Sequence, residues 1–128
     1  MADPKLLVLD LDGTALNADR RLAAVDVEAA RRLRSAGVHV TIATGRIFTG
    51  TQRVARELGV RGPVAVMNGC EILDAESGAT LFGAYVRPDA HRAIRGVLYA
   101  HGLSPFLFES RTIHFGSPDD QHFSASGG

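Results

Sequence analysis

The sequence has little that could cross-link the chain or anchor it in a membrane. Its single cysteine, Cys70, excludes an internal disulfide and is typical of a reducing compartment, so we expect the cytoplasm. The first apolar run, Leu6 to Leu9, is too short for a signal peptide or a membrane span, and Asp10 closes it. We therefore predict a cytoplasmic protein without a membrane partner.

The sequence also has no excess of positive or negative charge. The 14 basic and 14 acidic residues cancel, so no net field favours nucleic acid, and any binding of phosphate must come from local groups. Lys5 is the only lysine, which makes thirteen of the 14 basic residues arginine. With 45% hydrophobic residues in 128, the composition predicts one folded core rather than a disordered chain.

Short apolar runs alternate with helical periodicity in the first half of the chain. The runs predict three buried strands, at Lys5 to Leu9, Val38 to Ala43 and Val64 to Met67. Two helices lie between them and end at Gly37 and Gly59. This alternation predicts an α/β fold with a parallel sheet in the order third–second–first strand, whose carboxyl ends face one crevice.

The pattern changes after Asn68. Two apolar runs, Glu71 to Asp74 and Ala79 to Tyr85, flank a turn-rich segment and predict a β-hairpin. A helix that begins at Pro88 and ends at Gly102 follows, with short strands near residues 105–108 and 112–115. We therefore divide the chain into an incomplete α/β core at 1–83, the start of an α+β module at 84–120 and a disordered tail at 121–128.

Two acids separated by one residue follow the first strand. In phosphoryl transfer one carboxylate can attack phosphorus to form an aspartyl-phosphate, while another protonates the leaving oxygen and later activates water. Asp10 suits the first role and Asp12 the second. Because an anionic nucleophile must approach an anionic phosphate, we expect Mg²⁺ between them, on carboxylate and carbonyl ligands. The alternative is a simple Asp-Gly turn after a strand.

The other two strand ends also carry polar residues. Thr44 follows the second strand and can hold phosphate oxygens, Gly45 permits close approach, and Arg46 contacts substrate or braces the loop. The alternative here is a helix-entry turn with a solvated arginine. Asn68 closes the third strand, where it either lines the crevice or only forms the turn into the hairpin.

The polar motifs at the three strand ends, in their order along the chain, resemble those of the haloacid dehalogenase (HAD) superfamily. The resemblance covers residues 5 to 115. Asp10–Thr14 is similar to its first motif, Thr44 falls where the Ser/Thr of its second motif lies, and Ala43–Arg46 with Asn68–Gly69 resembles the Cof-type subclass, class IIB. The resemblance implies a Rossmann-like sheet followed by a substrate-selecting cap. It implies Asp10 as nucleophile and metal ligand, Asp12 as acid/base with its backbone carbonyl on Mg²⁺, Thr44 as phosphoryl ligand, and a small phosphorylated metabolite, such as a sugar phosphate, as substrate.

Two motifs of that family are not seen in this sequence. The third is a lysine and the fourth an acidic pair, both after the cap; Lys5 precedes the nucleophile, and we interpret Asp119–Asp120 as a polar turn. We therefore expect a chain truncated within its cap, with feeble activity and a first strand whose exposed edge favours self-association. A phosphomutase of the same superfamily and a non-enzymatic fragment remain the alternatives.

Overall fold

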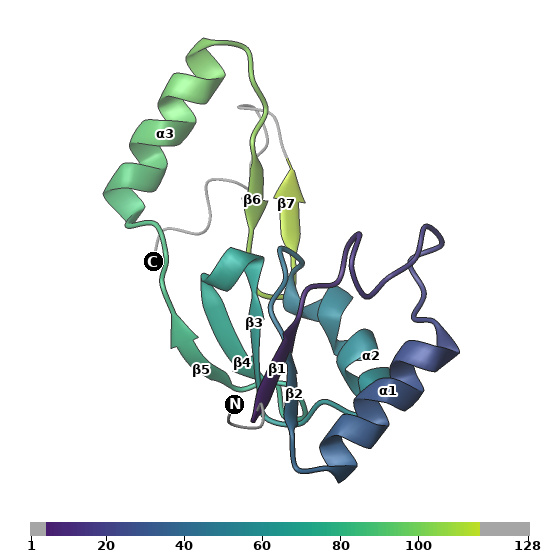
Figure 1. Ribbon diagram of the computed structural model, residues 1–128. Coiled ribbons are helices and arrows are strands. Elements are labelled where there is room, and N and C mark those ends of the chain that lie inside the picture. Colours follow the sequence, from purple (N-terminus) through teal and green to yellow (C-terminus); the bar gives the residue numbers. More distant parts are fainter. Residues whose placement is uncertain (1–4, 116–128) are drawn as a thin grey trace.

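The computed structural model describes residues 5–115 (Figure 1). The elements follow in the order β1 (Leu6–Leu9), α1 (Ala24–Ser35), β2 (His39–Ile42), α2 (Phe48–Leu58), β3 (Pro63–Val66), β4 (Glu71–Asp74), β5 (Thr80–Gly83), α3 (Pro88–Ala100), β6 (Phe106–Phe108) and β7 (Ile113–Phe115). The predicted fold class, α/β with a parallel pair of strands at its start, is confirmed. The proposed tail at 121–128 and Asp119–Asp120 lie outside the described residues.

The first three strands run side by side in the predicted order. β1 and β2 pair in parallel, with Leu9 opposite Ile42, and β3 joins β2 through one parallel bridge between Ala43 and Ala65. β3 then pairs antiparallel with β4, and β4 with β5. The carboxyl ends of β1, β2 and β3 therefore lie at one edge, which is where the polar residues of the sequence follow them.

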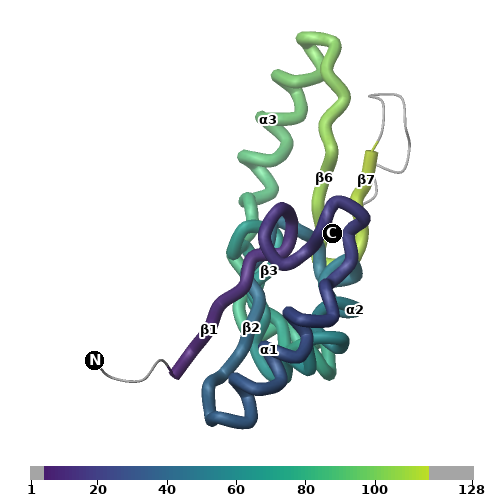
Figure 2. Tube along the Cα trace, turned by 45° about the vertical axis from the view of Figure 1, so that its right-hand side comes forward, coloured from purple at the N-terminus to yellow at the C-terminus, as the bar shows by residue number. Residues whose placement is uncertain are grey.

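Within residues 5–115, helices cover only one face of this sheet (Figures 1 and 2). Side chains alternate in burial along the strands, and Val40, Ile42, Val64 and Val66 point into the core. The continuous apolar run of the first strand predicted burial on both faces, but Leu6 and Val8 are 57% and 51% exposed. β1 lies at an edge of the parallel pair with β2 as its only strand partner among residues 5–115. Self-association through this edge stays a prediction.

Helices α1 and α2 cover the buried face, and Figures 1 and 2 show them together on one side of the strands. α2 carries the wider apolar stripe, because its buried residues recur every three or four positions: Phe48, Thr51, Val54, Ala55 and Leu58. It ends at Gly59, whose φ of 65° is left-handed and favours glycine. α1 buries only Ala30 fully. The core therefore lies between α2 and the sheet.

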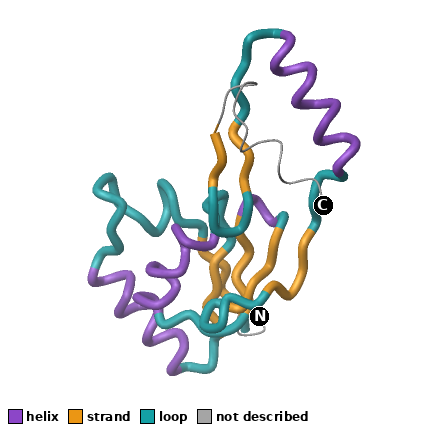
Figure 3. The backbone as a smooth tube through the Cα atoms, turned by 180° about the vertical axis from the view of Figure 1, so that it is seen from behind, coloured by secondary structure: helices purple, strands orange, loops and turns teal. Residues whose placement is uncertain are grey.

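The segment after β5 is built differently. None of the residues of α3, β6 or β7 is buried, and Figure 3 shows α3 standing apart from the strands of the sheet. β6 and β7 form an antiparallel hairpin in which the rings of Phe106 and Phe115 stack, with centroids 4.7 Å apart. The predicted helix and strands are all present. Within the described part of the chain, no helix has the length and apolar character needed to cross a membrane.

Candidate active site

The chain turns sharply as it leaves β1 and places two carboxylates at the sheet edge. The N–H groups of Ala15 and Leu16 donate back to the carbonyls of Asp10 and Leu11, at 3.3 and 2.8 Å, and Gly13 takes a left-handed φ of 74°. Leu11, between the two acids, is fully buried and anchors the turn, whereas Asp10 and Asp12 are exposed. The Thr14 hydroxyl donates to Asp10 Oδ2 at 3.3 Å. The spacing of one residue thus presents both carboxylates to solvent.

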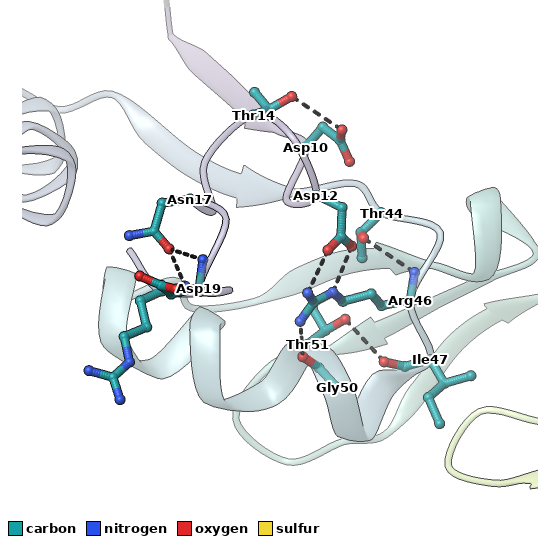
Figure 4. Close-up of polar contacts among 11 residues, drawn as sticks. Asp10, Asp12, Thr14, Asn17, Asp19, Thr44, Arg46, Ile47, Gly50 and Thr51 are labelled. Atoms are coloured by element: carbon teal, nitrogen blue, oxygen red, sulfur yellow. Dashed lines mark hydrogen bonds and ion pairs between the residues drawn. The ribbon is translucent and has the colours of Figure 1, made fainter. Parts of the chain in front are cut away.

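The loop after β2 lies beside this turn. The N–H of Ala43 donates to the carbonyl of Leu9 at 2.9 Å, which fixes the end of β2 next to the start of the Asp10 turn. Thr44 is buried and its hydroxyl accepts the N–H of Arg46 at 3.2 Å. Figure 4 shows Asp10, Asp12, Thr44 and Arg46 grouped at this edge. The structure therefore brings these four predicted residues together.

The Arg46 side chain forms a two-pronged ion pair with Asp12. Its Nε donates to Oδ2 at 2.7 Å and its Nη2 to Oδ1 at 2.6 Å, as the dashed lines of Figure 4 mark. This hydrogen-bonded guanidinium lowers the pKa of the Asp12 carboxyl below its ordinary value. Of the alternatives that the sequence left for Arg46, the structure thus shows a bracing contact, directed at the second acid itself.

The turn after β3 is hydrogen-bonded to the loop after β2. The N–H of Asn68 donates to the Thr44 carbonyl at 3.0 Å, and the N–H of Met67 to the Arg46 carbonyl at 2.9 Å. A Cβ on Gly45 would lie 2.9 Å from Asn68 Oδ1, so a glycine is needed for Asn68 to approach. Asn68 also has a left-handed φ of 57° in the turn between β3 and β4. It therefore both forms the turn and lies against the Thr44 loop.

Mg²⁺ fits the donors that this edge offers. Among residues 5–115, no group of three or more His, Cys, Asp or Glu side chains could surround a metal. Mg²⁺ needs no such cage, because it keeps several waters and binds through one or two carboxylates together with phosphate oxygens. Asp10 is exposed and, among the described residues, its carboxylate is engaged by Thr14 alone, so it is available. The carboxylate of Asp12 is held by Arg46, so Asp12 would contribute its backbone carbonyl.

A buried carboxylate near the site was not anticipated from the sequence. Glu71 at the start of β4 is buried, and its Oε1 accepts the Ser110 hydroxyl at 2.7 Å and the Tyr85 hydroxyl, while Oε2 has no hydrogen-bond partner within the part of the chain that the structure describes. Ser110 lies 39 positions further along the chain, and no periodicity or motif links the two. The contact ties the turn between β6 and β7 to the core. The hydrogen bond between Glu71 and Ser110 can therefore be found only from the folded structure.

Comparisons with known proteins agree with this arrangement. The family model of the haloacid dehalogenase-like hydrolases matches residues 7–125. The HMP-PP phosphatase of Yersinia pestis (strain Pestoides F) is 34% identical over 79 residues, which cover 62% of this chain and 29% of that protein.

Two solved structures share the fold. A haloacid dehalogenase-like hydrolase from Bacteroides thetaiotaomicron has a TM-score of 0.77 and 26% identity, over 92% of this chain and 46% of its own. A subclass IIB sugar phosphatase of the superfamily has a TM-score of 0.72 and 20% identity, over 94% of this chain and 47% of its own. The chain spans less than half the length of each of these three proteins.

Proposed function

Because this chain belongs to the haloacid dehalogenase-like hydrolases, as its motifs predicted, we propose that the protein is a Mg²⁺-dependent phosphatase of small phosphorylated metabolites. The observation that carries the proposal is the meeting of Asp10, Asp12 and Thr44 at one sheet edge, where within residues 5–115 the Asp10 carboxylate accepts a hydrogen bond only from Thr14 (Figure 4). The Yersinia relative is a phosphatase by name, which supports this class of substrate. A sugar phosphate as substrate and a cytoplasmic location stay predictions.

In the proposed first step, an oxygen of the Asp10 carboxylate attacks phosphorus, and the bond from phosphorus to the leaving oxygen breaks. Asp12 gives the departing oxygen a proton, while Thr44 and the backbone of its loop hold the phosphoryl oxygens. A bound Mg²⁺ would neutralise charge between the phosphate and Asp10. The product of this step is an aspartyl-phosphate on Asp10 and a free alcohol or acid.

In the second step, Asp12 takes a proton from a water molecule that attacks the same phosphorus, and the bond to Asp10 breaks. The contact with Arg46 lowers the pKa of Asp12 and so keeps this carboxyl ionised, which suits this second step. The first step needs Asp12 protonated. Arg46 must therefore release at least one Asp12 oxygen when substrate binds, and it is then free to bind an anionic oxygen of the substrate.

Replacing the proposed nucleophile tests this mechanism. We expect Asp10→Asn to lower Mg²⁺-dependent release of inorganic phosphate from a general phosphate ester by more than about a hundredfold, because an amide is a poor nucleophile. Asp19→Asn is the matched control, since Asp19 lies on the following loop and its side chain makes no hydrogen bond or ion pair within residues 5–115. Measuring free phosphate also separates hydrolysis from transfer to a second hydroxyl, as in a mutase.

A second readout does not depend on turnover. Beryllofluoride mimics a phosphoryl group on a carboxylate, so ¹⁹F NMR of the chain with Mg²⁺ should show a bound signal that is lost in Asp10→Asn and kept in Asp19→Asn. Near-parent turnover by Asp10→Asn, or hydrolysis that proceeds without a divalent cation, would contradict the aspartyl-phosphate mechanism.

A further inference from the structure

A cavity of about 290 Å³ lies next to Arg46, on the side of the Asp12 turn where α2 begins. Its charged lining consists of Arg20 and Arg21 from the loop after the Asp10 turn, Arg46, and Arg53 and Glu57 from α2. Figure 4 shows Arg46 reaching from Asp12 towards Gly50, which also lines this cavity. The cavity and the candidate active site thus share one arginine.

The charge of this lining is unbalanced. Asp12 neutralises Arg46, whereas within the described residues the side chains of Arg20, Arg21 and Arg53 make no hydrogen bond or ion pair. Arg20 also interacts electrostatically with Asp12, so the four lining arginines are opposed only by Glu57 and the adjoining Asp12, which leaves a formal charge of +2. The whole chain has a formal net charge of zero, so the excess is local.

Several arginines elsewhere on the surface have acidic partners. Arg31 and Arg32 bind Glu28 at 2.7 and 2.9 Å, and Arg87 binds Asp89 at 2.8 Å. Solvated arginines without partners are ordinary when single, but three that converge on a cavity repel one another. An arrangement of this kind is expected where an anion enters and balances the charge.

The loop that carries two of these arginines is held in one conformation. The Asn17 side-chain oxygen accepts the N–H groups of Asp19 and Arg21, both at 3.0 Å, and Arg20 has a left-handed φ of 58°. A non-glycine residue in that region is uncommon and costs energy, which the surrounding contacts must offset. The loop backbone therefore holds the Cα positions of Arg20 and Arg21 beside the cavity.

We propose that this arginine-lined cavity binds a second phosphate-type anion beside Asp12. Guanidinium groups match phosphate oxygens in pairs, and an open cavity of this size admits a phosphate group. The inference rests on the proposed function, because Asp12 would protonate the leaving oxygen and the cavity adjoins it. The anion is then either the inner phosphate of a diphosphate substrate or the inorganic phosphate that the reaction releases.

Binding can be tested on the 128-residue chain by amide NMR at constant ionic strength, with inorganic phosphate and methylenediphosphonate as probes. We expect the amides of Arg20, Gly50 and Arg53 to shift on titration. The double substitution Arg20→Ala with Arg53→Ala should weaken binding at least about tenfold, since two charge-assisted contacts are lost. Arg56→Ala is the matched control, because Arg56 is exposed on the same helix and does not line the cavity.

The two sources of the anion give different results. For a diphosphate, methylenediphosphonate binds more tightly than inorganic phosphate, and Thr44→Val removes that advantage because one ligand spans both sites. For released phosphate, the two probes bind alike and Thr44→Val leaves the cavity shifts unchanged. Asp10→Asn should preserve the cavity shifts in either case, so failure of the phosphatase mechanism does not remove this site.

The inference is overturned if the double variant binds both probes as tightly as the parent chain, or if only amides of the Thr44 loop respond. All the substituted arginines are exposed, so the variants should keep the parent amide spectrum away from the cavity. Arg20→Lys with Arg53→Lys extends the test, because lysine keeps the charge but loses the paired geometry. Intermediate affinity in that variant is the expected outcome.

Discussion

Residues 5–83 and residues 84–115 both form helices and strands, yet the two regions bury their side chains very differently. Every buried hydrophobic side chain among the described residues lies between Leu11 and Ala75, whereas Ile94, Val97 and Phe106 in the second region are more than half exposed. The first region has a core of its own. The second is held by local hydrogen bonds and by contacts of its β6–β7 turn with the first, so regular secondary structure by itself says little about stability.

Hydrogen bonds make up much of the contact between the two regions. The Phe48 N–H donates to the Ser110 carbonyl at 2.7 Å, the Arg111 Nη2 donates to the Gly78 carbonyl at 2.8 Å, and the Arg111 guanidinium lies 5.3 Å from the Phe48 ring centre. Phe48 begins α2, directly after the loop that carries Thr44 and Arg46. The second region is thus attached to the part of the first that forms the candidate site.

The largest difference between the two regions should appear when one leucine in each is replaced by alanine and the free energy of unfolding is measured. Leu58 is 2% exposed in α2 and Leu103 is 55% exposed after α3. We expect Leu58→Ala to lower the free energy of unfolding by about 2–5 kcal/mol, because it removes buried methyl groups and leaves a cavity. Leu103→Ala should change it by less than about 0.5 kcal/mol. Urea denaturation followed by circular dichroism measures both, and equal losses would show that the regions share one core.

A smaller effect should follow from removing the Ser110 hydroxyl. Ser110→Ala leaves the buried Glu71 carboxylate with one donor fewer, which costs about 1–3 kcal/mol in such settings. We expect this loss to appear as faster amide hydrogen exchange in β6 and β7, with little change in β1–β3. Ser104→Ala is the control, because Ser104 is exposed and makes no side-chain hydrogen bond within residues 5–115. Unchanged amide exchange in β6 and β7 would show that the hydrogen bond between Ser110 and Glu71 does not hold the two regions together.

The smallest effect concerns the ion pair of the site, which belongs entirely to the first region. Arg46 lowers the pKa of Asp12, so the pairing stabilises the fold above the ordinary carboxyl pKa and is lost as the pH falls through the lowered one. Arg46→Gln should raise the Asp12 pKa towards its ordinary value, with little change in stability at neutral pH, because the pair is half exposed and screened.

A ¹³C NMR titration of the side-chain carboxyls checks this shift. Arg61→Gln serves as the control, since the one ion pair of Arg61 among the described residues is a loose contact of 3.8 Å with Glu76. An Asp12 pKa that does not move in Arg46→Gln would mean that the ion pair does not form in solution.

Local patterns were enough for most of the elements. Asp10, Thr44 and Asn68 each follow an apolar run, and the parallel alternation predicts their common edge without knowledge of any contact. The exposure of Leu6 and Val8 was the main departure, because an apolar run does not reveal how many faces of its strand will be covered. The missing information is which elements pack on which side.

The sequence by itself determined the family, the strand order and the group of polar residues at the sheet edge, because each strand is a local pattern and parallel alternation brings the strand ends to one edge. Only the tertiary structure decided that Arg46 holds Asp12, that Glu71 holds Ser110, and that arginines from a loop and a helix share one cavity. These pairs are separated by 34 and 39 positions. Contacts at such separations depend on how the elements pack, and side-chain geometry then selects the partner that no local pattern specifies.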